Sequence, residues 1–131
     1  MGSKVILAID DNPAILAVIR SILKDQYDVL ISKSAPMAMN ILKTEKADLI
    51  LLDIEMPGMS GFEFLHEIRK NPRCMKIPVL IVSSHAGDEF RKHAELCGAE
   101  GLVSKPIDAE LLRQKISNAL TNPVKSILAD L

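Results

Sequence analysis

Asp48-Leu49-Ile50-Leu51-Leu52-Asp53 (residues 48–53) is the clearest indication of the fold in this chain. Four consecutive aliphatic residues stop abruptly at a carboxylate, which is typical of a short strand buried on both faces. We therefore predict a strand over 48–52 with Asp53 at its carboxyl end. Four further short runs predict strands, three of which also end in polar groups: Val5–Ile9 before Asp10-Asp11, Tyr27–Ile31, Pro78–Val82 before Ser83-Ser84-His85, and Gly101–Ser104 before Lys105-Pro106.

Segments with helical periodicity separate these strands. Asp11-Asn12-Pro13 supplies a cap residue and a proline suited to a first helical turn. Helices are predicted over Ala14–Lys24, Ala35–Thr44, a segment containing Phe62, Leu65 and Ile68, Asp88–Leu96 and Asp108–Leu120. Strict alternation of strands and helices favours right-handed crossovers and a parallel sheet. The predicted class is α/β, a doubly wound five-stranded parallel sheet of flavodoxin-like order 2-1-3-4-5 with helices on both faces.

Composition restricts the functions that are open to the chain. Its 131 residues suit one domain, and 48% hydrophobic with 25% charged residues excludes disordered and fibrous classes. A net charge of -1 predicts no direct binding to nucleic acid or to anionic lipid. The aliphatic runs are far shorter than a membrane span, and the first residues do not resemble a signal peptide. We expect a cytoplasmic protein whose Cys74 and Cys97 are free thiols.

The polar residues at the strand ends indicate phosphoryl chemistry. In open α/β sheets, ligands bind beyond the carboxyl ends of the strands, where Asp10, Asp11, Asp53, Ser83 and Lys105 are expected to meet. Two carboxylates about 4 Å apart repel by about 4 kcal/mol at an effective dielectric constant of about 20, so a cation such as Mg²⁺ is expected among them. A carboxylate can also attack phosphorus, while a lysine and a hydroxyl stabilise the transferred oxygens.

This ordered set of residues resembles the receiver domain of bacterial response regulators over residues 4–120. The loop 53–61, DIEMPGMSG, is also similar to the loop that follows the phosphorylated aspartate in that family. The resemblance implies that Asp53 accepts a phosphoryl group and that Ser83 and Lys105 bind the phosphoryl oxygens. It further implies Mg²⁺ (or Mn²⁺) at Asp10, Asp11, Asp53 and the Glu55 backbone carbonyl, with Asp10 acting through water, and a cis Lys105-Pro106 bond.

The same resemblance implies a phosphorylation-dependent signalling switch rather than an enzyme that turns over a separate substrate. Its expected partners are a sensor histidine kinase or a phosphotransfer protein, and then a downstream protein or an output domain outside this chain. The tail 121–131 has apolar residues at helical spacing, which would suit docking, a homodimer or the start of a linker helix, and a frayed terminus is the alternative.

Some positions leave other interpretations open. The family usually has an aromatic residue where this chain has Leu102, so a degenerate receiver that binds partners without phosphorylation is one alternative. Asp53-Ile54-Glu55 has the acid-x-acid spacing of phosphatases resembling haloacid dehalogenases, although those enzymes carry it after their first strand. A flavodoxin-like cofactor binder is disfavoured because Asp10-Asp11 would repel a phosphate. Taken singly, Asp11 could be a helix N-cap and Lys105 an ordinary loop lysine. Glu55 and His85 are expected to influence the lifetime of the phosphate.

Overall fold

Five strands and five helices alternate along the chain in the computed structural model, which describes residues 2–85 and 87–121. The elements are β1 (Val5–Ile9), α1 (Pro13–Leu23), β2 (Asp28–Ser32), α2 (Ala35–Thr44), β3 (Leu49–Asp53), α3 (Gly61–Lys70), β4 (Val79–Ser83), α4 (Asp88–Leu96), β5 (Gly101–Ser104) and α5 (Ala109–Thr121). The predicted alternation of strands and helices is therefore confirmed.

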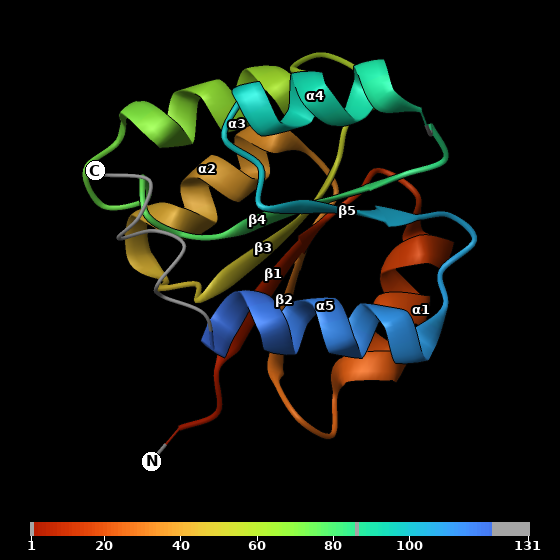
Figure 1. The fold of residues 1–131 in the computed structure, drawn as a ribbon. Helices are drawn as coiled ribbons and strands as arrows, with labels where there is room; N and C mark the ends of the chain where they lie inside the picture. The colour runs from red at the N-terminus through yellow and green to blue at the C-terminus, as the bar shows by residue number, and fades with distance from the viewer. Residues whose placement is uncertain (1, 86, 122–131) are drawn as a thin grey trace.

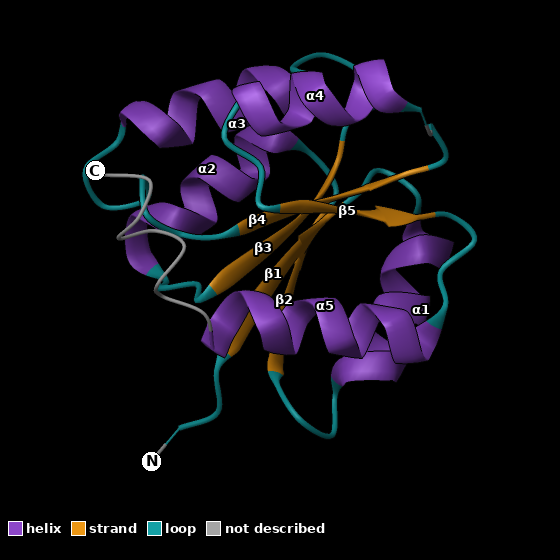
Figure 2. Cartoon of the chain, in the orientation of Figure 1, coloured by secondary structure: helices purple, strands orange, loops and turns teal. Residues whose placement is uncertain are grey.

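All four strand pairs are parallel, and the order across the sheet is β2-β1-β3-β4-β5, as predicted. Helices α1 and α5 cover one face of the sheet, and α2, α3 and α4 cover the other (Figures 1 and 2). The direction of winding reverses at β1, which lies between β2 and β3, and the central strand of the sheet is β3. The carboxyl ends of β1, β4 and β5 all lie at the right of Figure 1. Among the described residues, no helix is long and apolar enough to cross a bilayer.

Two apolar layers hold the helices on the sheet. Because side chains alternate across a strand, Leu7 and Ile9 pack toward α2, α3 and α4, whereas Ile6 and Ala8 pack toward α1 and α5. The central strands are buried along their whole length, as their uninterrupted aliphatic runs predict. Each fully buried leucine or isoleucine contributes about 1.5 to 3 kcal/mol, so the sheet is a rigid support for the residues that follow it.

Several boundaries differ from the predicted ones by one residue. Strand β2 runs from Asp28 to Ser32 rather than 27–31, because Asp28 pairs with Val5 and donates its backbone N–H to the Lys4 carbonyl. Helix α5 begins at Ala109, after Asp108 accepts a hydrogen bond from the Leu111 N–H at 3.1 Å. Thr121 is the last residue of α5, and the remainder of the predicted tail, 122–131, lies outside the described residues.

Candidate functional site

Three carboxylates meet at the carboxyl ends of β1 and β3. One carboxylate oxygen from each of Asp10, Asp11 and Asp53 lies within 4.8 Å of the other two. Asp10 and Asp53 are buried, with 2% and 5% of their surface exposed, whereas Asp11 is exposed. The neighbouring strands bring these residues together, because Ile9 of β1 pairs with Leu52 of β3 and each aspartate follows directly. The convergence expected from the strand ends is therefore present.

Hydrogen bonds of the β1–α1 loop fix the Asp10 carboxylate. The Asp10 N–H donates to the Ser32 carbonyl at 3.0 Å, and its Oδ1 accepts the Asn12 N–H at 2.9 Å. Asn12 is the N-cap of α1, and its Oδ1 accepts the Ala14 N–H at 2.9 Å. The helix starts at Pro13, one residue earlier than predicted. Since Asn12 is the cap, Asp11 does not have the alternative role of helix cap that its position allowed.

Lys105 reaches two of the carboxylates from the end of β5. Its Nζ donates to Asp10 Oδ2 at 3.1 Å and to Asp53 Oδ1 at 3.4 Å, and its side chain is only 22% exposed. Its backbone N–H donates to the Ser83 carbonyl at 3.0 Å, and the Lys105-Pro106 bond is cis, as predicted. Burial alone would lower the pKa of Lys105, but the hydrogen bond and charge of Asp10, followed by those of Asp53, raise it above its usual value. Lys105 is therefore a charged partner of the carboxylates rather than an ordinary loop lysine.

The site carries more negative charge than Lys105 neutralises. Burial and then repulsion by Asp10 raise the pKa of Asp53, while Lys105 and the Glu55 N–H act in the opposite direction. Three carboxylates against one ammonium group leave two negative charges, which is the charge that one divalent cation would balance. Carboxylate oxygens are ligands that hard cations such as Mg²⁺ and Mn²⁺ prefer. The donor set therefore fits a hard divalent metal ion.

Ser83 ends β4 and His85 follows it, on the other side of Asp53 from β1. Residues Asp53 and Val82 pair across β3 and β4, which places Ser83 one residue beyond Asp53 along the sheet. The buried Ser83 accepts the His85 N–H on its Oγ at 3.0 Å, so its own hydroxyl proton is available for another acceptor. The His85 Nε2 contacts Glu55 Oε1 and joins the loops after β3 and β4. No described contact tests the Glu55 carbonyl as a metal ligand, so that role stays a prediction.

The loop after Asp53 is held by the start of α3. The Gly61 N–H donates to the Ile54 carbonyl at 2.9 Å, and a Cβ on Gly61 would lie 2.4 Å from the Asp53 carbonyl oxygen. Ser60 and Glu63 form a reciprocal capping box that begins this helix at Gly61, one residue before the apolar residues used to predict it. The Ser-x-x-Glu spacing would have located this cap, whereas the close approach at Gly61 is a tertiary contact without a sequence signal.

Comparison with known proteins shows the family of this chain. The family model described as "Response regulator receiver domain" matches residues 6–117. The chain belongs to this family. The receiver domain is 30% identical to "Protein PilH" of Pseudomonas aeruginosa over 116 residues, which are 88% of this chain and 96% of that protein. The structure of the Vibrio cholerae chemotaxis protein CheY4 has a TM-score of 0.87 at 27% identity and covers 91% of this chain and 100% of its own.

Other relatives are much longer proteins. A "Probable cyclic di-GMP phosphodiesterase" of Vibrio cholerae is 34% identical over 117 residues, which are 89% of this chain. The receiver domain spans 26% of that relative's length, so it matches a part of a larger protein. As a receiver domain of two-component systems, the chain is a phosphorylation-dependent signalling switch. The interpretation as a phosphatase resembling haloacid dehalogenases is not favoured. In this chain the pair Asp53 and Glu55 lies at the end of the third strand, β3, whereas those enzymes carry it after their first strand, and the chain belongs to the receiver family.

Proposed function

We propose that this receiver domain accepts a phosphoryl group on Asp53 and that Ser83 and Lys105 bind the transferred oxygens. The observation that carries the proposal is the bridge from Lys105 Nζ to both Asp10 and Asp53 at 3.1 and 3.4 Å. This bridge holds a cation beside the candidate nucleophile, where negative charge would develop on the phosphoryl oxygens. The Ser83 hydroxyl, which accepts from the His85 N–H, keeps its proton for a phosphoryl oxygen.

The transfer step conserves atoms and charge. A carboxylate oxygen of Asp53 attacks the phosphorus of a phosphohistidine or of a small acyl phosphate, and a new P–O bond forms. The P–N or P–O bond to the donor breaks, and the leaving imidazole or carboxylate takes the bonding electron pair. Lys105, whose Nζ lies 3.4 Å from Asp53 Oδ1, would offset the charge of the acyl phosphate. Hydrolysis later returns inorganic phosphate and the free carboxylate.

Asp10, Asp11 and Asp53, together with the Glu55 backbone carbonyl, are the residues that we propose hold Mg²⁺ (or Mn²⁺). Asp10 would act through water, because Lys105 and the Asn12 N–H already occupy its two oxygens. The bound ion would supply positive charge to the phosphoryl oxygens and lower the repulsion between the carboxylates. The exposed position of Asp11 leaves this side of the site open to solvent.

We further propose the partners and limits of the domain. The phosphoryl donor would be a sensor histidine kinase or a phosphotransfer protein, because relatives include proteins named "Sensor histidine kinase". The receiver domain would span 4–120. The tail from 121 onward would dock on a downstream protein, form a dimer with a second copy or continue into an output domain. The chain would promote only its own phosphorylation and dephosphorylation. The described cysteines are both free, which suits the reducing cytoplasm where such a kinase would find ATP.

The test is phosphorylation by acetyl phosphate, followed by intact mass spectrometry. In the presence of Mg²⁺, wild-type protein should gain the mass of one phosphoryl group, and Asp53→Asn should gain none. Asp25→Asn is the matched control, since Asp25 is exposed in the turn between α1 and the start of β2, at the opposite edge of the sheet from the three carboxylates. Equal labelling of Asp53→Asn and wild type, or labelling that is unaffected by EDTA, would contradict the proposal.

A further inference from the structure

Four rings form a continuous series of contacts between the β4–α4 loop and helix α4. The ring of His85 stacks on Phe90, with centroids 5.5 Å apart and planes at 28°. Phe90 contacts Phe62 of α3 at 5.8 Å, and Phe62 meets the edge of His93 at 4.5 Å. We call these four residues the ring chain. The His93 Nε2 in turn lies 3.6 Å from the sulfur of Cys97, directly after the end of α4.

Helix α4 has few other attachments to the domain. Ala94 is its one fully buried residue, and Leu96 is 87% exposed. Its N-cap is Gly87 at φ 128°, and no side chain caps its first turn. A helix without a side-chain cap and with one buried residue depends on its remaining contacts for its position. The ring chain supplies such contacts at the first turn of the helix, through Phe90, and near its last turn, through His93.

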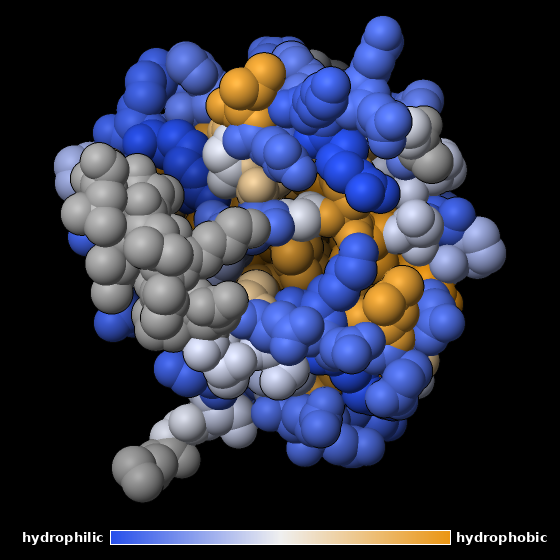
Figure 3. Space-filling view, in the orientation of Figure 1, coloured by the Kyte–Doolittle hydropathy of each residue, from blue (hydrophilic) through white to orange (hydrophobic). Residues whose placement is uncertain are grey.

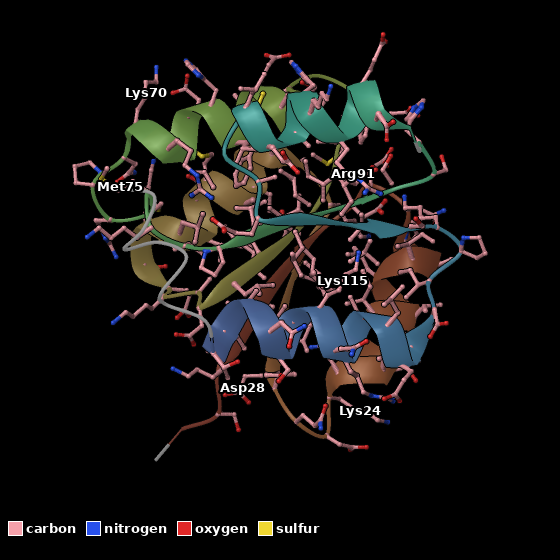
Figure 4. The ribbon with its side chains drawn as sticks, viewed as in Figure 1. Lys24, Asp28, Lys70, Met75, Arg91 and Lys115 are labelled. Atoms are coloured by element: carbon pink, nitrogen blue, oxygen red, sulfur yellow. The ribbon has the colours of Figure 1, made fainter. Side chains whose placement is uncertain are left out.

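The surface beside α4 has room for the helix to move. A cavity of about 210 Å³ lies between α4, β5 and α5, and Ala94, Leu102 and Lys115 are among the residues that line it. Figure 3 shows apolar surface at the floor of this hollow with hydrophilic side chains around it. In Figure 4, Arg91 of α4 and Lys115 of α5 lie on opposite sides of β5. Leu102, which stands where the family usually has an aromatic residue, contributes no ring to this region.

The other end of the ring chain touches the candidate phosphorylation site. The His85 N–H donates to Ser83 Oγ at 3.0 Å, and the His85 side chain contacts the Glu55 carboxylate. A phosphoryl group on Asp53 would attract the Ser83 hydroxyl and repel the Glu55 carboxylate, because it adds about -1.5 to -2 charges and three acceptor oxygens. Both effects act on His85, and the ring of His85 lies against Phe90.

We propose that Phe90 couples the phosphorylation site to the position of helix α4, through the stack of His85 on Phe90 and the contact of Phe90 with Phe62. This inference rests on the proposed function and assigns the route by which its signal leaves the site. When Ser83 and Glu55 respond to the phosphoryl group, His85 moves, and the first turn of α4 follows its ring contact with Phe90. The ring chain thereby takes the role for which β5 of this chain has no aromatic residue.

The experiment uses fluoroberyllate, a phosphoryl mimic, and the reactivity of the Cys97 thiol. The half-buried Cys97 follows α4 and contacts the ring chain through His93, so its rate of alkylation by iodoacetamide reports the position of the helix. Replacing the buried Cys74 by alanine leaves one thiol to follow. In this background, Mg²⁺ and fluoroberyllate should change the alkylation rate by about threefold or more as the population of α4 positions shifts. Binding of fluoroberyllate is followed separately by ¹⁹F NMR.

Phe90→Leu should bind fluoroberyllate as the parent does but leave the Cys97 rate unchanged on binding. Phe62→Leu cuts the next contact of the ring chain and should have the same result, which also covers a failure of the first variant to fold. Leu96→Ala is the matched control, because this exposed residue lies on α4 outside the ring chain, and it should respond like the parent.

The outcomes separate the two proposals. A parental response in either of the two phenylalanine variants, or an unchanged Cys97 rate when the parent binds fluoroberyllate, would overturn the role of Phe90 and leave Asp53 phosphorylation standing. If Phe90→Leu does not fold and therefore binds no fluoroberyllate, the response of Phe62→Leu decides. If the parent itself binds no fluoroberyllate, the proposed function and the coupling through Phe90 both fail. Retained binding with a lost response in Phe90→Leu and Phe62→Leu, together with a normal response in Leu96→Ala, would support the coupling.

Discussion

Replacing Asp53 by asparagine should stabilise the metal-free protein, although it removes the group proposed to accept phosphate. Oxygens of Asp10 and Asp53 lie within 4.8 Å of each other, so their repulsion is about 3.5 kcal/mol at an effective dielectric constant of about 20. The attraction between Lys105 and Asp53 across 3.4 Å is about 5 kcal/mol on the same scale. The charged Asp53 is 5% exposed, and its desolvation costs several kcal/mol more.

These terms combine to disfavour the Asp53 charge, in agreement with its raised pKa. Asparagine keeps the shape and an acceptor oxygen for Lys105 but carries no charge, so the free energy of unfolding should rise by about 1 to 2 kcal/mol. The melting temperature should increase by about 3 to 8 °C. Thermal unfolding followed by circular dichroism at neutral pH in EDTA measures this change. Asp25→Asn is the control and should stay within about 0.5 kcal/mol of wild type.

Addition of Mg²⁺ should reverse the order of the two proteins. Wild-type protein should gain about 2.7 kcal/mol at a metal concentration about one hundred times the dissociation constant, whereas Asp53→Asn should gain little because a metal ligand is lost. A metal-free Asp53→Asn protein that is less stable than wild type by about 1 kcal/mol or more, the size of one ordinary hydrogen bond, would refute the reasoning. The pairing with Lys105 would then outweigh burial and repulsion.

Because the pKa of Asp53 is raised in the folded state, the folded state binds this proton more tightly than the unfolded state does. The metal-free protein should therefore lose stability as the pH rises from about 4 through the folded-state pKa of Asp53. Urea titrations at several pH values should show this loss in wild type and not in Asp53→Asn. Lys105→Ala leaves buried carboxylates without their cation and should lower the free energy of unfolding by about 3 to 5 kcal/mol in EDTA. A loss below about 1 kcal/mol would show that the bridge from Lys105 to the two carboxylates contributes little to stability. Gly61→Ala places a Cβ against backbone atoms and should cost about 1 to 3 kcal/mol in chemical denaturation, so an unchanged midpoint would contradict the close approach. His85→Ala breaks the exposed contact with Glu55 between two loops of the site and should speed decay of labelled phosphoprotein by up to about fivefold, whereas an unchanged decay rate would exclude this role.

Some of the site follows from local sequence patterns alone. Aliphatic runs that end in Asp10, Asp53 and Ser83 predicted strands buried on both faces, and strand alternation with helices required these ends to share one edge of a parallel sheet. The residues of the candidate site could therefore be named before their distances were known. The helix cap at Ser60 could also have been predicted from the sequence, because the spacing of Ser60 to Glu63 is a local signal.

Boundaries and individual roles needed the tertiary structure. Strand β2 could not be placed to the residue by propensity, since its start depends on pairing with Val5 of β1. The sequence offered both Asp11 and Asn12 as the cap of α1, and the hydrogen bond from Ala14 decides for Asn12. The raised pKa of Asp53 arises from burial and from Asp10, which is distant along the chain.

Local periodicity and residue type were enough to predict the class of the fold and the order in which chemical groups appear at the strand ends, and the resemblance of that ordered set indicated the family. The three-dimensional packing was needed to show that Lys105 bridges Asp10 and Asp53, that Gly61 lies against the Asp53 carbonyl, and that four rings join His85 to helix α4. Such contacts join residues that are far apart in the chain, and their distances follow from how whole elements pack rather than from any local pattern.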